Sequence, residues 1–182
     1  GHQFDPQCSK ILVVGGSLGA SALNENLPAA FAALQHTKAL SIWHQTGKGQ
    51  LGGVTEQYKA LELEAKVEQF IDDIDLAYRW ADIVICRAGA LTVSEIAAAG
   101  KMALFIPFPH AVDDHQTANA GYLVDNHAAL LLQQGDMDTE IVVSMLKPYV
   151  ENNELISEMA QRAKALAKLD ATEQVAYFCQ QL

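Results

Sequence analysis

The chain has 182 residues, of which 50% are apolar and 19% are charged, and its formal net charge is -10 at pH 7. This length suits a single domain with a buried core. The acidic balance, without any Lys/Arg cluster, argues against nucleic acid or an anionic membrane as the direct partner. No apolar run reaches the roughly 18 residues that span a bilayer. We therefore expect a soluble domain without membrane insertion, in which local groups hold any bound anion.

The three cysteines, Cys8, Cys86 and Cys179, are odd in number and far apart, and no C-x-x-C spacing occurs. This pattern indicates neither a disulfide framework nor a zinc site, and it fits a reducing cytosol. The chain opens on Gly1-His2 without an initiating Met, which is typical of the scar of a cleaved tag. We therefore assign residues 1–9 to a tag scar and a linker, and we expect a fragment of a longer protein.

Six apolar runs of strand length alternate with segments that carry apolar residues at helical spacing. The expected strands cover residues 10–14, 40–45, 66–71, 82–86, 102–108 and 129–133. The expected helices between them cover residues 24–34, 51–63, 74–80, 91–99 and 115–126. Helices of this size between strands imply right-handed crossovers. The sequence therefore predicts an α/β fold with a doubly wound parallel sheet, in which ligands bind beyond the carboxyl ends of the strands.

After about Asp136 the pattern is wholly helical. The expected helices cover residues 139–146, 153–167 and 172–182, with a break at Pro148 and a start signal at Asp170-Ala171-Thr172. We place one ligand-binding domain at residues 10–168. The short break before residue 172 leaves residues 169–182 as a C-terminal helix that is free to cross to another domain of a longer protein.

The most informative segment is the run from Arg87 to Glu95, a small-residue turn and helix start directly after an apolar strand. Backbone N–H groups at a helix start have no intrahelical partner, and the helix dipole adds about half a positive charge, so a phosphate can bind there without a basic side chain. Glu95, a few residues later, is suited to hold a polyol such as ribose. The alternative is that Thr92 and Glu95 form a capping box that bonds the helix's own end.

A glycine turn, Gly15-Gly16-Ser17-Leu18-Gly19, joins the first strand to the first helix. Such a turn lets the backbone approach a phosphate closely, but it equally permits tight packing of strand on helix. It is not the dinucleotide fingerprint, because Val14 stands at the first glycine position and the second strand ends in His44-Gln45 instead of an acid. Gly47-Lys48-Gly49 lacks the Ser/Thr of a Walker motif. We therefore expect neither NAD binding nor ATP hydrolysis.

A third loop follows the fifth strand and leads into a helix near Asp114. Gln116 and Asn119 are three residues apart and lie on one face of that helix. Their amides donate and accept hydrogen bonds, as sugar hydroxyls require, although each amide alone is also typical of an ordinary surface. His110 and His115 lack a closed set of metal ligands, so we expect no metal site.

Two D-x-D pairs, Asp73-Ile74-Asp75 and Asp136-Met137-Asp138, are the remaining acidic motifs. In some sugar-nucleotide enzymes such a pair holds a divalent cation. Both pairs stand just before helical patterns, where aspartates cap helix N-termini. We therefore predict capping for both.

Taken together, these loops closely resemble the C-terminal half of the MurG family, the bacterial UDP-N-acetylglucosamine (UDP-GlcNAc) transferases that complete the peptidoglycan lipid precursor. The likeness covers nearly the whole chain. The segments that carry it are Gly15-Gly16-Ser17-Leu18-Gly19-Ala20, Trp43-His44-Gln45-Thr46-Gly47-Lys48, Phe70-Ile71-Asp72-Asp73, the run 87–100 and the run 107–119.

The resemblance implies one Rossmann-like half of a GT-B glycosyltransferase, the half that binds the sugar-nucleotide donor. By this likeness Phe70 and the backbone of Ile71 hold uracil, and Glu95 takes both ribose hydroxyls. The diphosphate is received by Ser17 and the turn Ala90-Leu91-Thr92. Gln116 and Asn119 face the GlcNAc hydroxyls. Gly16, Arg87 and His115 are secondary candidates for contact with the donor.

The family's reaction is an inverting transfer of GlcNAc from UDP-GlcNAc to the C4 hydroxyl of lipid-linked MurNAc-pentapeptide, which converts lipid I to lipid II in cell-wall synthesis. The resemblance implies no metal or other cofactor, and it places the catalytic base, the lipid I pocket and the membrane-docking surface in the N-terminal half. We expect a cytoplasmic protein that is peripheral on the inner membrane at full length, and a fragment that binds UDP-GlcNAc without transferring it. Alternatives are a UDP-GlcNAc 2-epimerase-like domain and a non-catalytic nucleotide-binding module.

Overall fold

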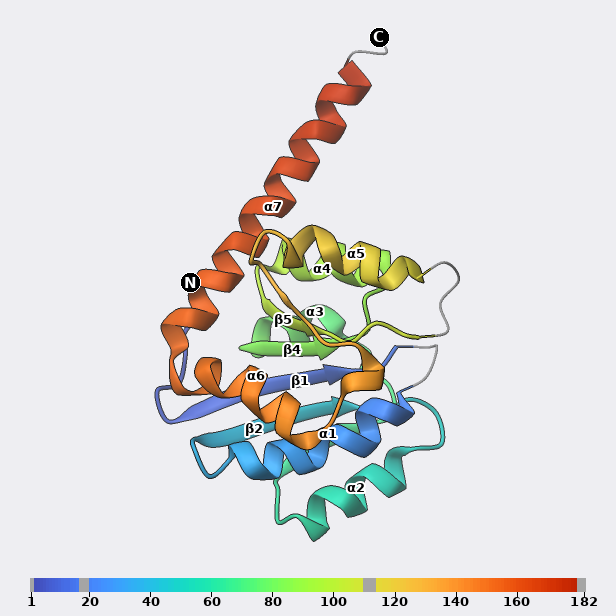
Figure 1. Cartoon of the computed structure of the whole chain (residues 1–182), viewed down its shortest axis with the longest axis vertical. Coiled ribbons are helices and arrows are strands. Elements are labelled where there is room, and N and C mark those ends of the chain that lie inside the picture. Colours follow the sequence, from blue (N-terminus) through green and yellow to red (C-terminus); the bar gives the residue numbers. More distant parts are fainter. Residues whose placement is uncertain (1, 17–19, 110–113, 180–182) are drawn as a thin grey trace.

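The computed structural model describes residues 2–16, 20–109 and 114–179, with side chains described through residue 167. Within these residues a parallel six-stranded sheet lies between two layers of helices, in the strand order β3-β2-β1-β4-β5-β6 (Figure 1). The strands are β1 (Cys8–Val14), β2 (Ala39–Gln45), β3 (Ala65–Glu68), β4 (Ile83–Cys86), β5 (Met102–Phe105) and β6 (Leu130–Leu131). The predicted doubly wound parallel sheet is therefore confirmed.

The helices divide between the two faces of the sheet. One face packs against α1 (Ser21–Leu34), α2 (Leu51–Ala60) and α6 (Thr139–Glu151), the last entered through the short 3₁₀ turn η2 (Gln134–Asp136). The other face packs against α3 (Ile74–Trp80), α4 (Ala90–Ala99) and α5 (His115–Val124). The last helix, α7 (Asn153–Cys179), contributes to both cores near its start, and its C-terminal part extends away from the rest of the fold (Figure 1).

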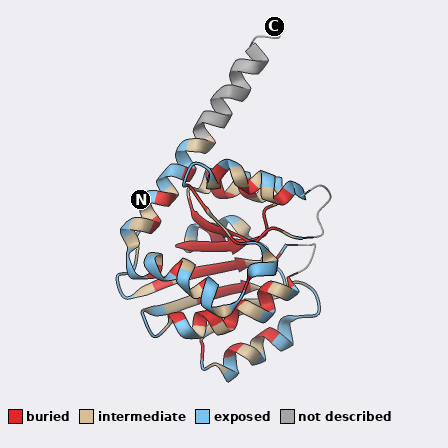
Figure 2. Cartoon of the chain, viewed as in Figure 1, coloured by how far each residue is buried: buried red, intermediate tan, exposed pale blue. Residues whose placement is uncertain are grey.

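The central strands are apolar on both faces. In β1, Ile11 and Val13 belong to the core under α1 and α6, whereas Leu12 belongs to the core under α3 and α4. All three side chains are fully buried. Figure 2 shows the central strands β1, β4 and β5 mostly buried between helices whose outer surfaces are exposed. Burial on both faces explains why these strands appear in the sequence as continuous apolar runs rather than as alternating patterns.

The strand register aligns the carboxyl ends of β1, β2, β4 and β5 at one edge of the sheet. Val14, the last residue of β1, pairs with Gln45 at the end of β2 and with Cys86 at the end of β4. Cys86 in turn pairs with Phe105 at the end of β5. The loops that follow these strands therefore start side by side and share one edge of the sheet, on the right in Figure 1.

Strands β3 and β5 end three residues earlier than predicted, which releases residues into the loops, and β6 covers only Leu130–Leu131 of the predicted range 129–133. β3 ends at Glu68 instead of residue 71, and β5 ends at Phe105 instead of residue 108. After β5, Pro107 has no N–H to donate to a ladder, so the strand cannot continue. After β3, the N–H of Ile71 donates to the side chain of Gln45 at 3.2 Å rather than to a neighbouring strand.

The predicted break at Pro148 is wrong, because α6 continues through Pro148 to Glu151. A proline in a helix removes the N–H that would bond the carbonyl four residues earlier, here that of Ser144. Pro148 and Ser144 are both exposed, so water can satisfy that carbonyl. The chain turns instead at Asn152, whose side-chain oxygen accepts from the N–H of Glu154 at 3.0 Å.

The predicted start of a separate helix at Asp170-Ala171-Thr172 is also wrong, because α7 runs without interruption from Asn153 to Cys179. Aspartate and threonine favour caps but do not break a helix. None of the helices in the described part of the chain is long and apolar enough to cross a membrane.

Candidate functional site

Gly15 and Gly16, in the turn after β1, are suited to their positions for two different structural reasons. A Cβ on Gly15 would lie 2.1 Å from the Cβ of Ala20, so no larger residue fits between the strand and α1. Gly16 has a φ of +74° in open space, where a Cβ would come within 4.0 Å only of Arg87 Cγ. Tight packing is therefore confirmed for Gly15, and Gly16 lies beside the loop after β4. Ser17 lies outside the described residues.

Within the described residues, the backbone N–H groups at the start of α4 have no hydrogen-bond acceptor. Gly89 is the N-cap residue, without a side-chain cap, and the first helical bond joins Val93 N–H to the Gly89 carbonyl at 3.0 Å. The N–H groups of Ala90, Leu91 and Thr92 therefore precede the helical ladder. With the helix dipole, such groups can bind an anion without a basic side chain. Leu91 is 73% exposed, so this end is open to solvent.

The alternative of a capping box formed by Thr92 and Glu95 is wrong, because Gly89 is the N-cap residue and no side chain caps the helix. The helix begins two residues before Thr92, and Glu95 lies in its second turn. The Glu95 carboxylate instead accepts a hydrogen bond from the hydroxyl of Tyr78 on α3, at 3.2 Å. Glu95 and Tyr78 line a hollow of about 280 Å³ between α3 and α4. Sequence reasoning missed Tyr78, because no motif distinguishes it from an ordinary core aromatic residue.

Gln116 and Asn119 hold the backbone of the loop after β4. The side-chain oxygen of Gln116, which is buried, accepts from the N–H groups of Ala88 at 3.1 Å and of Phe108 at 2.8 Å. The side-chain nitrogen of Asn119 donates to the Ala88 carbonyl at 3.1 Å. The two amides lie on one helix face, as predicted. These backbone contacts were not predicted, because sequence spacing does not show which loop the helix faces.

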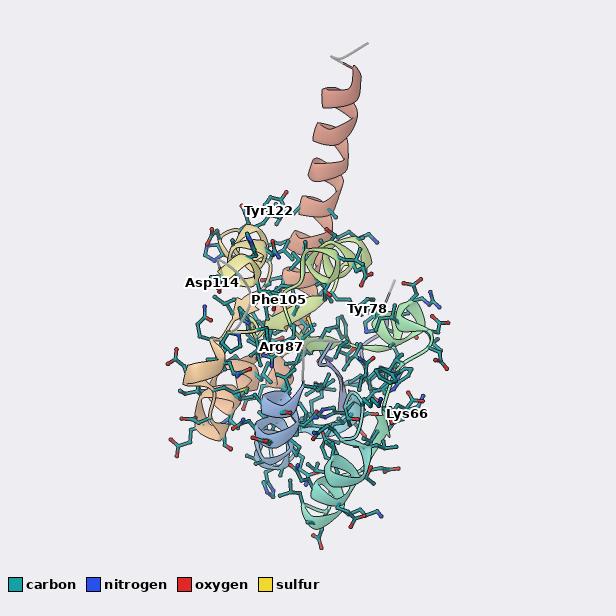
Figure 3. All side chains as sticks on the ribbon, turned by 90° about the vertical axis from the view of Figure 1, so that its right-hand side faces the viewer. Lys66, Tyr78, Arg87, Phe105, Asp114 and Tyr122 are labelled. Atoms are coloured by element: carbon teal, nitrogen blue, oxygen red, sulfur yellow. The ribbon has the colours of Figure 1, made fainter. Side chains whose placement is uncertain are left out.

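Arg87 lies in the middle of the sheet edge. Figure 3 looks onto the carboxyl ends of the strands and shows Arg87 between Tyr78 on one side and Asp114 on the other. Its guanidinium donates to the Ile106 carbonyl at 3.2 Å and lies over the Phe108 ring, 5.3 Å from the centroid. Burial lowers the pKa of Arg87. His115, the first residue of α5, is exposed.

A shallow hollow lies between the loops after β1, β2 and β3. It has a volume of about 290 Å³, and Gly16, Thr46, Lys48 and Phe70 are among its lining residues. Phe70 is 56% exposed, so much of its ring surface is accessible to a ligand. The Ile71 N–H is engaged by Gln45, whereas within the described residues no backbone N–H donates to the Ile71 carbonyl, which is therefore the group that can accept from a ligand there.

A buried polar network supports the end of β2. The two ring nitrogens of His44 lie 2.7 Å from the Tyr58 hydroxyl and 2.8 Å from Asn24 Oδ1. Asn24 also donates from Nδ2 to the Thr46 carbonyl at 3.0 Å. Burial lowers the pKa of His44 to about 3, so the ring is neutral at pH 7. Where dinucleotide-binding proteins carry a ribose-binding acid, this chain carries a neutral structural histidine and Gln45.

Both D-x-D pairs cap helices, as predicted. Asp73 accepts from the N–H of Leu76 at 2.9 Å, and Asp138 accepts from the N–H of Ile141 at 2.8 Å. Each aspartate therefore satisfies a backbone donor in the first turn of its helix.

Two larger hollows lie away from this edge. One, of about 590 Å³, is lined by Trp43, Trp80 and Lys66, and the other, of about 400 Å³, is lined by His2, Asp82 and Lys101. Lys66 lies 3.8 Å from the centroid of the Trp43 ring, and the buried Lys101 ammonium donates to the Ala81 carbonyl at 2.8 Å. Lys66 and Lys101 are thus already engaged by the protein, whereas the α4 start offers N–H groups that lie outside the helical ladder.

Comparisons with known proteins point to one family. The model of the glycosyltransferase family 28 C-terminal domain matches residues 10–175. A curated relative from Pseudoalteromonas translucida is 62% identical over 94% of this chain, and one from Shewanella sp. (strain ANA-3) is 51% identical over 93%. Both are named UDP-N-acetylglucosamine--N-acetylmuramyl-(pentapeptide) pyrophosphoryl-undecaprenol N-acetylglucosamine transferase. The chain spans about half the length of these relatives, 49% and 48%.

Solved structures agree in fold. The crystal structure of Acinetobacter baumannii MurG superposes with a TM-score of 0.85 and 45% identity, covering 96% of this chain and 52% of that one. The glycosyltransferase VinC in complex with dTDP superposes with a TM-score of 0.64 at 15% identity, covering 94% of this chain and 41% of that one, which shows the fold alone. These neighbours are GT-B glycosyltransferases. The chain belongs to the glycosyltransferase family 28 C-terminal domain family.

Proposed function

We propose that this chain is the donor-binding half of an inverting glycosyltransferase that moves GlcNAc from UDP-GlcNAc to lipid-linked MurNAc-pentapeptide. The observation that carries the proposal is the α4 start, where three N–H groups outside the helical ladder precede a carboxylate on the same helix. The names of the curated relatives supply the donor and the acceptor.

Each part of the donor has a candidate partner along the sheet edge. Phe70 stacks on uracil, and the Ile71 carbonyl accepts from its N–H group. Glu95 accepts from the two ribose hydroxyls, and the N–H groups of Ala90, Leu91 and Thr92 receive the diphosphate. Gly16 and Arg87 lie beside this diphosphate position. The family likeness adds Ser17 as a further partner of the diphosphate. Gln116, Asn119 and His115 stand at the start of α5 and face the sugar.

In this reaction the donor-binding half contributes mainly electrostatic stabilisation. In the proposed reaction the acceptor C4 hydroxyl attacks C1 of GlcNAc, the bond from C1 to the β-phosphate oxygen breaks, and UDP leaves with the electron pair. Negative charge therefore builds on the β-phosphate. A preorganised helix start stabilises such charge because its N–H groups need no reorientation. Within the described residues no group of three His, Cys, Asp or Glu side chains is placed to hold a metal ion.

The general base, the lipid I pocket and the membrane-docking surface belong, in this proposal, to an N-terminal half of the full-length enzyme. That enzyme is cytoplasmic and peripheral on the inner membrane. Residues 10–168 form the donor domain, and the C-terminal part of α7 is a contact for the other half. By itself the chain binds UDP-GlcNAc and does not transfer it.

Calorimetric titration of the chain with UDP, UDP-GlcNAc and UDP-GalNAc tests this proposal. We expect saturable binding of UDP and of UDP-GlcNAc at one shared site, and no release of UDP in the presence of a lipid-linked acceptor. Absence of both heat and a thermal shift at millimolar nucleotide would contradict it. The full-length enzyme separates the two alternatives: conversion of UDP-GlcNAc to UDP-ManNAc without acceptor indicates an epimerase, and binding without turnover indicates a non-catalytic module.

A further inference from the structure

The contact between Tyr78 and Glu95 joins the core to the proposed ribose position. Tyr78 is 3% exposed, and its ring is part of the core between the sheet, α3 and α4. Tyr78 also lines the hollow between the two helices, and its hydroxyl donates to Glu95 Oε2 at 3.2 Å. The packed ring therefore fixes the position of one hydrogen-bond donor relative to α4.

Glu95 needs such a fixed donor. Its side chain is half-buried and has three rotatable bonds, and within the described residues it forms no ion pair. A carboxylate that accepts from two neighbouring hydroxyls must hold one rotamer, and immobilising a free glutamate on binding costs conformational entropy. A carboxylate has about four acceptor positions, so one bond from Tyr78 leaves enough for two ribose hydroxyls.

The Tyr78 hydroxyl remains a donor at all working pH values. Burial, with smaller contributions from Cys86 and Glu95, raises the pKa of Tyr78. The hydroxyl therefore stays protonated beside the Glu95 carboxylate. Because the carboxylate can only accept, the direction of this hydrogen bond is fixed.

We propose that Tyr78 is a positioning residue that holds Glu95 in the rotamer that reads the ribose hydroxyls, so that it sets the preference of this site for ribonucleotides over 2′-deoxyribonucleotides. This inference rests on the proposed role of Glu95 in donor binding. It adds a residue of α3 to a site otherwise made of loops and the starts of α4 and α5.

Calorimetry with UDP and 2′-deoxy-UDP tests the proposal through the ratio of their affinities. In Tyr78→Phe the ring remains and only the hydroxyl is lost. We expect UDP to bind roughly three- to tenfold more weakly to this variant, the effect of one net hydrogen bond, while 2′-deoxy-UDP changes much less. Tyr58→Phe is the matched control, because it also removes a buried tyrosine hydroxyl, one that bonds His44 and not Glu95. It should lose stability but keep the wild-type ratio.

Glu95→Ala separates failure of this inference from failure of the proposed function. If Glu95→Ala loses the preference for UDP and Tyr78→Phe keeps it, the role of Tyr78 is refuted and donor binding through Glu95 stands. If Glu95→Ala also keeps the preference, both are refuted. Titrations run below the unfolding temperature of each variant. A crystal structure of Tyr78→Phe adds a second measurement: we expect Glu95 in more than one rotamer, and a single unchanged rotamer contradicts the proposal.

Discussion

The side-chain oxygen of Gln116 accepts a hydrogen bond from the backbone N–H of Ala88 at 3.1 Å, across 28 residues of sequence. The same oxygen accepts from the N–H of Phe108 at 2.8 Å. One buried amide therefore ties the loop after β4 to the loop after β5, directly before the helix start that we assign to the diphosphate. Gln116 therefore fixes the backbone of two loops of the proposed site, in addition to lying beside that site.

We predict that Gln116→Ala destabilises the chain and weakens UDP as well as UDP-GlcNAc. The substitution leaves two N–H groups without an acceptor, each at a cost of about 1 to 3 kcal/mol when buried. Gln116→Glu keeps an acceptor oxygen and should lose less stability. Chemical denaturation and calorimetry measure the two effects. If Gln116 contacts only the sugar, Gln116→Ala should leave stability and UDP affinity unchanged and weaken only UDP-GlcNAc binding.

Gly15→Ala should be strongly destabilising because the new Cβ would lie 2.1 Å from the Cβ of Ala20. Overpacking of this kind typically costs about 1 to 3 kcal/mol. The double variant Gly15→Ala/Ala20→Gly removes the clash, so we expect it to recover part of the lost stability in thermal unfolding. Equal destabilisation of the single and double variants would show that the conformation of Gly15, and not its packing, is the constraint.

The sequence was sufficient for the sheet and for the edge at which the loops after its strands meet. Continuous apolar runs such as Ile83–Cys86 identify buried parallel strands, and the glycines mark the turns after them. Long-range hydrogen bonds could not be predicted in this way. Nothing in the spacing of Tyr78 and Glu95, or of Gln45 and Ile71, shows that these pairs meet, because each contact depends on how helices and loops from separate βα units are placed.

Local signals failed where tertiary packing overrides them. Thr92 and Glu95 fit a capping box, but the helix begins at Ala90, and Glu95 bonds Tyr78 on the neighbouring helix. Pro148 is a helix breaker in isolation, yet α6 packs on α1 and tolerates it on its exposed side. In both cases a short motif was overruled by contacts with elements distant in sequence.

The aspartate caps give a prediction that also tests for a cation site. Asp73→Ala and Asp138→Ala should each cost about 1 kcal/mol of stability and leave UDP affinity unchanged, because each removes only a cap. Asp75→Ala and Asp136→Ala are the matched controls from the same pairs, and we expect smaller losses. A thermal shift on adding Mg²⁺ or Mn²⁺ that disappears in both members of a pair would instead identify a metal site.

The stability of the folded chain should decrease as the pH is lowered, because of His44. Burial lowers its folded-state pKa to about 3, below the ordinary value of 6.5. Below pH 6.5 the unfolded chain therefore binds a proton that the folded chain does not, so this contribution is complete above pH 6.5 and decreases as the pH falls toward 3. The loss is about 1.4 kcal/mol for each pH unit in that window.

His44→Gln is the control, because an amide retains a donor and an acceptor for Asn24 and Tyr58 without titrating. Urea unfolding of both proteins between pH 7 and pH 5 isolates the histidine, since the other groups titrate equally in the two chains. We expect the variant to lose less stability over that interval. Parallel pH profiles would mean that His44 does not titrate differently in the folded and unfolded states.

The position of the bound donor tests the central claim most directly. In a crystal structure of the chain with UDP-GlcNAc, we predict that the diphosphate lies on the N–H groups of Ala90, Leu91 and Thr92, with both ribose hydroxyls on Glu95 and uracil beside Phe70. A nucleotide bound in the hollow lined by Trp43 and Trp80, or one that leaves the α4 start unoccupied, would contradict the account.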